Sequence, residues 1–333
     1  MIWAMVGMLL AAAAPAVAYV MIAWWLDRHE KEPIWLLVAL FLWGAAPAVV
    51  LVLFADSMVR EPLEAMMQPR EFQVFSPVMM APPIEELCKA LPLLLVFLFY
   101  RREFDGPADG LLYGAMVGFG FSMTEDFFYF LMQYGSNGVE GVIVLFVLRS
   151  LAFGLNHALY TSLFGLGLGI ARYATHPAMK FGAPALGLAA GISLHMLHNF
   201  LAAIGGYYGV PDEVTLMFLF ASFLIHSFGG VCWLGVMIAA GFQEARWIRE
   251  ELVEEVENGV LTKEQAWGSH HYRDRIRARM KGLAEKGAGH YHRLGSLYST
   301  AADLAFKKRQ HRLFGDEDGN LDEISRLREE LRR

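Results

Sequence analysis

Two adjacent glutamates, Glu85 and Glu86, lie inside an apolar segment long enough to cross a membrane. An ionised side chain near the centre of a membrane helix costs roughly 2.5–3.5 kcal/mol on insertion scales, so two neighbouring carboxylates need a reason. Lys89 follows four residues after Glu85 and three after Glu86, where it can pair with either carboxylate on a helix. One lysine cannot neutralise both glutamates. The remaining negative charge therefore needs another partner or a chemical role.

Three further apolar segments carry polar side chains. Each repeats one pattern, with two residues at positions i and i+4 that share a helix face. The three pairs are Phe121 with Glu125, Phe153 with His157, and His195 with Asn199. His198 lies one residue from the His195 face, so we expect it to support the site.

Some neighbouring polar residues are expected to lie outside the site. Asp126 should face away from it, and His226 is interpreted mainly as a core residue. Arg149 is expected to be an interfacial anchor or a partner of Glu140. Cys88 and Cys232 show neither a CxxC nor a Cys/His spacing, so no zinc-finger or redox motif is present.

Carboxylates and imidazoles from four helices suit the activation of water. A glutamate, or a Glu–His pair, takes a proton from water. The water attacks a peptide carbonyl, and a histidine or asparagine donates to the developing oxyanion. We expect the catalytic residues to be Glu85, Glu86, His157, His195 and Asn199, with Lys89, Glu125 and His198 in support.

Two alternatives stay open at this point. No cofactor is required, but a divalent metal such as zinc could be held by Glu85, Glu125, His157 and His195, although the chain has no HExxH motif. A chelator would separate the two mechanisms. A transporter, a proton relay or a scaffold without catalytic activity could also place Glu and His in a membrane, but we find no inverted repeats.

Composition explains what must position these residues. The chain has 333 residues, 56% of them hydrophobic and 19% charged, with a mean hydropathy of +0.36, which indicates a polytopic membrane protein. We predict an all-α bundle of about seven transmembrane helices, the first of them retained. The spans are 3–25, 34–55, 76–100, 110–133, 143–171, 182–208 and 214–241. Residues 139–147 are expected at the outer interface, so that the fifth span begins near Arg149.

Glycines at four-residue spacing are expected to let the helices approach closely. The pairs are Gly114 with Gly118, Gly165 with Gly169, and Gly187 with Gly191.

Charge is unevenly distributed along the chain. Residues 1–242 hold 10 Lys and Arg against 17 Asp and Glu, whereas residues 243–333 hold 18 against 17. We therefore expect a transmembrane domain, 1–242, and a charged helical tail, 243–333, with breaks at Gly259, Gly282, Gly287, Gly289 and Gly295. Basic residues favour the cytoplasmic side. The loops expected on that side contain Arg28, Lys31, Arg101, Arg102, Arg172 and Lys180. We therefore expect the N-terminus outside the cell and the C-terminus in the cytoplasm. The expected location is the plasma membrane.

The four motifs resemble the PrsW family of intramembrane proteases and, more distantly, the CAAX prenyl-endopeptidase superfamily. These motifs are Glu85-Glu86-x-x-Lys89, Phe121-x-x-x-Glu125, Phe153-x-x-x-His157 and His195-x-x-x-Asn199, joined by the loop Asp27 to Pro33 and by Gly114-x-x-x-Gly118-Phe-Gly-Phe121. The resemblance covers about residues 25–240. It implies a glutamic-type endopeptidase that cuts a membrane-anchored protein, such as an anti-sigma factor, with Glu85 as the catalytic glutamate. It implies no nucleic-acid partner, and it leaves the oligomeric state open.

Overall fold

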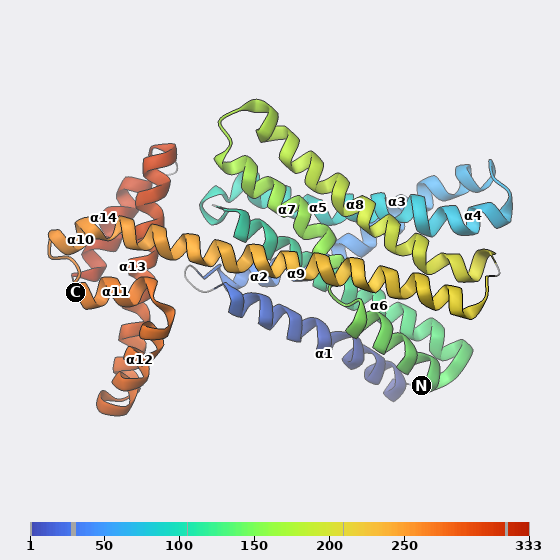
Figure 1. The fold of residues 1–333 in the computed structure, drawn as a ribbon, viewed down its shortest axis with the longest axis horizontal. Helices are drawn as coiled ribbons and strands as arrows, with labels where there is room; N and C mark the ends of the chain where they lie inside the picture. The colour runs from blue at the N-terminus through green and yellow to red at the C-terminus, as the bar shows by residue number, and fades with distance from the viewer. Residues whose placement is uncertain (1, 28–30, 105, 209, 317–318, 333) are drawn as a thin grey trace. The chain divides into compact units, whose positions relative to one another are not determined.

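The computed structural model describes residues 2–27, 31–104, 106–208, 210–316 and 319–332, and within these ranges the chain forms helices and no strands (Figure 1). The predicted all-α class is therefore confirmed. Arg28, expected in the first cytoplasmic loop, lies outside the described residues. The chain divides into two compact units, residues 1–24 with 33–235 and residues 25–32 with 236–333.

The first unit holds the long apolar helices. Its elements are α1 (Ile2–Leu26), α2 (Ile34–Trp43), η1 (Gly44–Ala48), α3 (Val49–Glu64), α4 (Pro69–Phe75), η2 (Ser76–Met80), α5 (Ala81–Phe99), η3 (Arg101–Glu103), α6 (Pro107–Leu145), η4 (Phe146–Ala152), α7 (Asn156–Tyr173), α8 (Pro177–Tyr208) and most of α9 (Asp212–Glu251). Three of these elements, η1, η2 and η4, are single π-helical turns.

Five helical stretches in the described chain are long and apolar enough to cross a membrane. They are Ile2–Leu26, Ile34–Glu64, Pro107–Tyr173, Pro177–Ile204 and Asp212–Glu257. The 67-residue stretch contains two predicted spans, α6 and α7. The predicted span 76–100 is not among the five, because α5 carries Glu85, Glu86 and Lys89 within its apolar sequence. The charges that mark the candidate site thus also reduce the apolar character of its helix.

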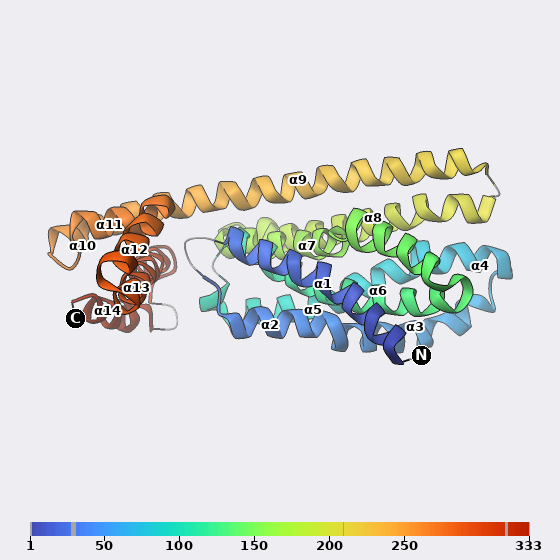
Figure 2. The same ribbon diagram turned by 90° about the horizontal axis from the view of Figure 1, so that it is seen from below.

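Helix α6 forms the centre of the first unit. Every residue from Gly110 to Ser122 is buried, and apolar side chains of α2, α5 and α7 pack around this segment. In Figure 2, α2 and α3 lie on one side of the unit, and α7 and α8 lie toward α9. Because α6 is enclosed on several sides, a polar residue on it must find a partner inside the protein.

Glycines allow α6 and α7 to approach closely. A side chain at Gly110, Gly114 or Gly118 would overlap the backbone of α7, and one at Gly187 or Gly191 on α8 would overlap α7 from the other side. The predicted role of the Gly114/Gly118 and Gly187/Gly191 pairs in helix packing is confirmed. Close backbone approach brings the side chains of three successive helices within reach of one another.

The helix that carries most of the fifth predicted span, α7, begins after Arg149. Helix α6 bends at Gly138, whose φ is +63°, and continues to Leu145. The π turn η4 follows, and α7 begins only at Asn156. Arg149 therefore lies in a π turn and not at the start of the span. Such turns redirect side chains relative to a regular helix and are frequent at functional sites.

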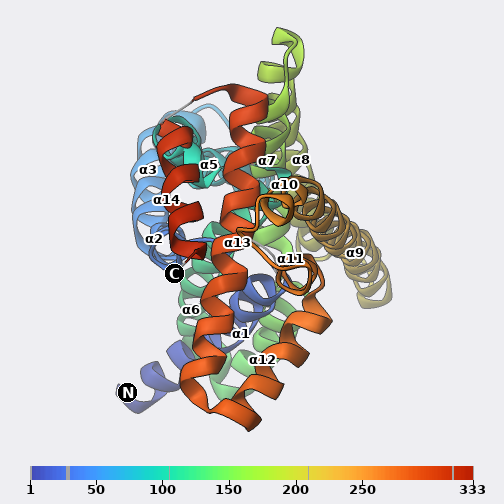
Figure 3. The same ribbon diagram turned by 90° about the vertical axis from the view of Figure 1, so that its left-hand side faces the viewer.

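The second unit contains residues 25–32, the end of α9 from Val236 and five further helices (Figure 3). These are α10 (Val253–Glu257), α11 (Lys263–His270), α12 (Tyr272–Lys286), α13 (Ala288–Phe314) and α14 (Asn320–Leu331). Ile248 of α9 and Leu252, the residue after that helix, pack on Ala301, Ala305 and Phe306 of α13. Two buried carboxylates hold α13 to α9 and α10, since Glu251 of α9 pairs with Arg312 at 2.6 Å and Glu255 of α10 pairs with Lys308 at 2.7 Å.

Candidate active site

The two glutamates lie in the first turns of α5, directly after the π turn η2. Pro82 and Pro83 have no N–H, so they cannot bond to carbonyls of the preceding turn. The N–H of Ala81 bonds to the Ser76 carbonyl, five residues earlier. The Pro77 carbonyl is thereby left without its usual helical donors. The proline pair therefore separates η2 from α5 and fixes where Glu85 and Glu86 begin their helix.

Lys89 is the central cation of the site, with no exposed surface. Its Nζ lies 2.7 Å from Oε1 of Glu86 and 3.5 Å from Oε2 of Glu85. It also lies 3.1 Å from Nδ1 of His157 and 4.1 Å from the centre of the Phe121 ring. The predicted pairing of Lys89 with the glutamates is present, and the ammonium links α5 to α6 and α7.

Glu86 has a partner for each of its oxygens. Oε1 accepts from Lys89 and lies 3.0 Å from Nδ1 of His195, and Oε2 accepts a hydrogen bond from Thr161 at 3.0 Å. Glu86 is 2% exposed, so these contacts replace the water that its carboxylate would otherwise bind. Thr161 was not predicted as a site residue. It lies four residues after His157, so the helical spacing of α7 could have indicated it.

Glu85 has fewer hydrogen-bond partners than Glu86. Apart from Lys89, its Oε2 has Nε2 of His195 at 3.9 Å, and this buried oxygen accepts no hydrogen bond within the described chain. Buried polar atoms normally have a hydrogen-bond partner. The two neighbouring glutamates therefore differ sharply, since one is fully bonded and the other has an oxygen free for a further group.

Glu125 reaches the site through His157. Nε2 of His157 lies 2.8 Å from Oε2 of Glu125, while its Nδ1 lies next to the Lys89 ammonium. Because the Lys89 ammonium can only donate, Nδ1 of His157 accepts its hydrogen bond. Nε2 of His157 therefore carries the ring proton and donates a hydrogen bond to Oε2 of Glu125. The predicted residues of α5, α6, α7 and α8 are thus joined in one chain of contacts from Glu125 to His195.

Arg149 and Asp126 form an ion pair that the sequence did not predict. Arg149 donates to Oε2 of Glu125 at 2.7 Å and to Oδ1 of Asp126 at 2.9 Å, and its guanidinium covers the Tyr129 ring at 3.9 Å. Ser150 donates to the second oxygen of Asp126 at 2.6 Å. Arg149 therefore pairs with the glutamate of the site and not with Glu140. The π turn η4 points it toward α6, which the sequence could not reveal.

Asn199 and His198 lie beside this chain of contacts. The Asn199 amide donates at 2.7 Å to the Pro77 carbonyl, the group that the proline pair leaves without its helical donors. His198 contacts the Phe153 ring and bonds to Ser222 of α9 at 2.9 Å, and His226 bonds to the Ser222 carbonyl. Asn199 thus connects α8 to the turn before the glutamates. Whether its amide also meets a substrate stays a prediction.

The four innermost acidic and imidazole residues could hold a metal ion. Donor atoms of Glu85, Glu86, His157 and His195 all lie within 4.8 Å of one another, and all four residues are buried. Carboxylate oxygens and imidazole nitrogens are ligands of Zn²⁺ and of other divalent transition metals. The donor set differs from the predicted one, because Glu86 takes the place of Glu125. Lys89 competes for the same donors, since its ammonium contacts Glu86 and His157.

Long apolar helices surround a buried cluster of glutamates and histidines. This arrangement defines an integral membrane protein whose site contains the side chains that a hydrolase uses to activate water. Residues 32–226 match the family described as "PrsW family intramembrane metalloprotease", and the chain belongs to the PrsW family. Every residue of the site lies within the matched segment, and α10–α14 lie beyond it.

Two curated relatives are both named "Protease PrsW". The chain is 32% identical over 170 residues to the protein of Geobacillus kaustophilus, covering 51% of this chain and 69% of that one. It is 30% identical over 134 residues to the protein of Shouchella clausii, covering 40% and 57%. No solved structure matches the chain. The resemblance to PrsW proteases read from the motifs is thus confirmed, and a protease is the function that these relatives support.

Proposed function

We propose that the chain hydrolyses a peptide bond of a membrane-anchored protein, with water activated by Glu85. The observation that supports this most directly is the contrast between the two glutamates. Glu86 is bonded to Lys89, His195 and Thr161, whereas the buried Oε2 of Glu85 accepts no hydrogen bond in the described chain. A general base must have an atom free to receive the proton of water.

The proton movements balance with the residues present. Glu85 removes a proton from water as the water oxygen bonds to the scissile carbonyl carbon, which gives a tetrahedral oxyanion. Lys89 has one N–H beyond those directed at Glu86 and His157, and it stabilises the negative charge. The protonated Glu85 then gives its proton to the leaving nitrogen as the C–N bond breaks. An acid and an amine are released.

The remaining contacts hold these groups in place. Glu125 orients His157, which fixes the Lys89 ammonium, while Glu86 orients His195. Arg149 in turn fixes Glu125. Pre-oriented groups inside a site shielded from water stabilise developing charge better than mobile ones, so we infer that Glu125 and Arg149 act through the residues they position.

A metal-dependent form of the same reaction is the alternative that the donor set supports. Glu85, Glu86, His157 and His195 would hold the ion. A bound divalent metal would polarise the carbonyl and make bound water more acidic. In that form, all four residues would serve as ligands, and Lys89 would have to lose its present contacts with Glu86 and His157.

The substrate follows from the family and from the location of the site. A site buried among membrane helices meets the membrane-spanning or juxtamembrane segment of another protein. An anti-sigma factor anchored by a single helix is the substrate class that the family resemblance suggests. We propose the bacterial plasma membrane as the location, with the C-terminus in the cytoplasm.

The test is cleavage of a tagged single-span substrate by the purified full chain. We expect Glu85→Gln and His157→Ala to lose cleavage by at least about 100-fold, the usual scale for a general base. Glu140→Gln is the matched control, because this carboxylate is exposed and lies outside the site. Full cleavage by Glu85→Gln at normal expression would eliminate the proposed base.

A chelator distinguishes the two forms of the reaction. Unchanged cleavage after prolonged chelation supports direct activation by Glu85. Loss that is restored by a single added divalent metal assigns the four residues as ligands. A wild-type chain that cleaves no membrane-anchored substrate with or without metal contradicts the proposed activity itself.

A further inference from the structure

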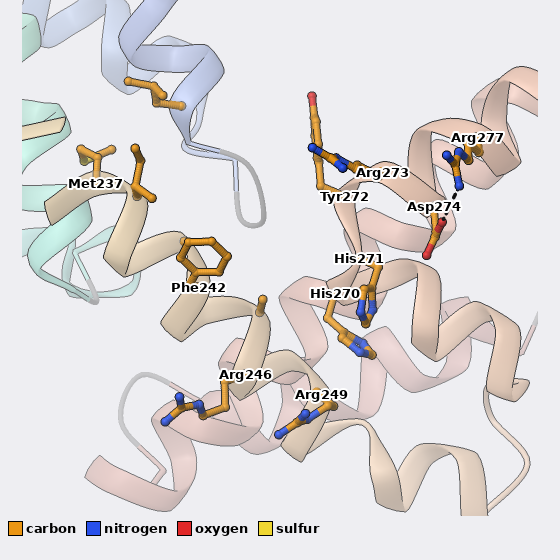
Figure 4. Close-up of a pocket in the computed structure, with 14 residues that line it drawn as sticks. Met237, Phe242, Arg246, Arg249, His270, His271, Tyr272, Arg273, Asp274 and Arg277 are labelled. Atoms are coloured by element: carbon orange, nitrogen blue, oxygen red, sulfur yellow. Dashed lines mark ion pairs between the residues drawn. The ribbon is translucent and has the colours of Figure 1, made fainter. Parts of the chain in front are cut away.

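A cavity of about 810 Å³ lies along the end of α9 in the second unit (Figure 4). The wall that α9 contributes changes character along the helix. Met237, Ile238 and Phe242 come first and are apolar, and Arg246 and Arg249 follow one to two turns later. This order places the apolar part of the wall around the end of the predicted span 214–241 and the two arginines after it.

The opposite wall is basic. Arg273 and Arg277 of α12 line the cavity, together with His270 and His271 at the junction of α11 and α12. Among the described lining residues, Asp274 is the only acid, and it accepts a hydrogen bond from Trp267 at 2.9 Å. Arg246, Arg249 and Arg273 form no ion pair within the described chain. Four arginines facing one acid leave an excess of positive charge.

Two basic groups near the cavity have pKa values that burial and neighbouring basic groups both lower. The pKa of His270 is lowered, mainly by burial and further by its electrostatic interaction with neighbouring His271 and Arg249. The pKa of Arg275, on the same α12, is lowered by burial and by neighbouring Arg279. Burial is the larger cause in both cases, and the neighbouring basic groups lower both pKa values further, as they would for any added cation.

Helix α12 carries an exposed apolar face next to the cavity. Ile276, Met280 and Leu283 are 42%, 53% and 38% exposed, and their spacing of four and three residues places them on one side of the helix. The helix contains six basic residues and two acidic ones. An exposed apolar stripe flanked by Lys and Arg is typical of a helix that lies on the surface of an anionic membrane.

We propose that this cavity binds the headgroup of an anionic phospholipid, with the lipid chains against the apolar wall of α9. The arginines recognise the phosphate, and Met237, Ile238 and Phe242 meet the part of the lipid next to it. A small soluble anion would use only the basic wall, and would leave the apolar wall and the stripe of α12 unexplained. The site lies outside the segment that matches the protease family, and it does not depend on the proposed catalysis.

The test compares lipid binding by the purified full chain and two variants with equal changes in charge. Arg246→Gln/Arg273→Gln removes two cavity arginines. Arg293→Gln/Arg332→Gln removes two exposed arginines that do not line the cavity. Each protein in neutral detergent is titrated with phosphatidylglycerol or phosphatidylcholine, and bound lipids are counted by native mass spectrometry. Inorganic phosphate is titrated separately as a competitor.

We expect the wild-type chain to bind phosphatidylglycerol more tightly than phosphatidylcholine. The cavity variant should lose roughly tenfold or more of this affinity, because each basic side chain near a membrane contributes a substantial attraction to anionic lipid. The control variant should keep it. Equal affinity for both lipids, equal loss in both variants, or full displacement of lipid by millimolar phosphate would each overturn the proposal.

Discussion

Lys89 is the residue whose environment is most demanding, because its ammonium is fully buried and contacts two glutamates and a histidine. We predict that Lys89→Met lowers the free energy of unfolding by about 3–5 kcal/mol, the cost of leaving one member of a buried ion pair without its partner. Chemical denaturation of the detergent-solubilised chain measures this. Adding Glu86→Gln to Lys89→Met should restore most of the lost stability.

The double variant makes the test specific for charge. Removing both partners leaves no uncompensated ion, so its stability should lie closer to wild type than that of Lys89→Met. If Lys89→Met costs less than about 1 kcal/mol, or if the double variant is the less stable of the two, the charge pairing described for Glu86 is wrong.

Individual residues show what spacing can and cannot predict. The sequence identified four residues of the site because each is a costly polar residue in an apolar segment, namely Glu85, Glu86, His157 and His195. The fold brings these four together. Arg149 was misassigned because sequence proximity favoured Glu140, while its real partners, Glu125 and Asp126, are 24 and 23 residues away and reach it only through η4. Helical spacing along the sequence cannot reveal a partner that a side chain reaches only because of a π turn.

At the scale of the elements, the contact between α6 and α7 depends on glycine. We predict that Gly114→Ala destabilises the chain by roughly 1–3 kcal/mol and reduces cleavage, because the new methyl group would overlap the backbone at Thr161 and Ser162. Backbone atoms cannot move aside as a flexible side chain can. Thermal unfolding in detergent and the cleavage assay measure the two effects.

Gly135→Ala is the matched control on the same helix. A methyl group there meets nothing within 4 Å, so the substitution should be neutral or slightly stabilising through the higher helix propensity of alanine. Equal destabilisation by both substitutions would show that the loss reflects α6 itself and not its seam with α7.

Asp303 makes the stability of α13 depend on pH. Burial is the main cause that raises the pKa of its carboxyl from 3.8 to about 6, with Glu330 and Glu323 adding to it and Lys307 and Arg275 opposing it. Because the folded state favours the protonated form, its stability is highest below pH 4 and falls as the pH rises through about 6. Asp303→Asn should therefore stabilise α13 by up to about 3 kcal/mol at pH 7.5.

Hydrogen exchange of the α13 amides, corrected for the intrinsic rate at each pH, measures this effect. The gain in protection should be clearly smaller at pH 4.5, where the wild-type carboxyl is largely protonated. Asp322→Asn, at an exposed carboxylate of α14, should change little at either pH. Equal gains at both pH values would contradict the raised pKa.

The helices beyond residue 243 show why glycine alone is a poor guide to helix ends. Gly259 and Gly287 have φ values of +70° and +82° and do end helices, as predicted. Gly282, Gly289 and Gly295 were also expected to break helices but lie inside α12 and α13. A side chain at Gly282 would meet His290, and one at Gly295 would meet Arg279, so tertiary packing explains these two glycines.

For the molecule as a whole, composition predicted the helical membrane class, and the buried charges of α5 made the number of crossings harder to count. Five stretches qualify by length and apolar sequence, and one of them contains both α6 and α7. If α6 and α7 each cross, these stretches would give six crossings, and α5 would give a seventh. The count decides the sidedness of the chain, because an even number places both ends on one side and an odd number places them on opposite sides.

We predict seven crossings, with the N-terminus outside and the C-terminus in the cytoplasm. The basic residues support this, since residues 243–333 hold 18 of the 28 Lys and Arg, and such residues near membrane helices favour the cytoplasmic side. With epitope tags at both ends of the full chain, a protease added to spheroplasts should remove only the N-terminal tag, and one added to inside-out vesicles only the C-terminal tag. Removal of both tags from the same side would mean that α5, with its pair of glutamates, does not cross the membrane. If the protease removes only the C-terminal tag in spheroplasts, the orientation is opposite to the predicted one, and α12 would face the outer leaflet.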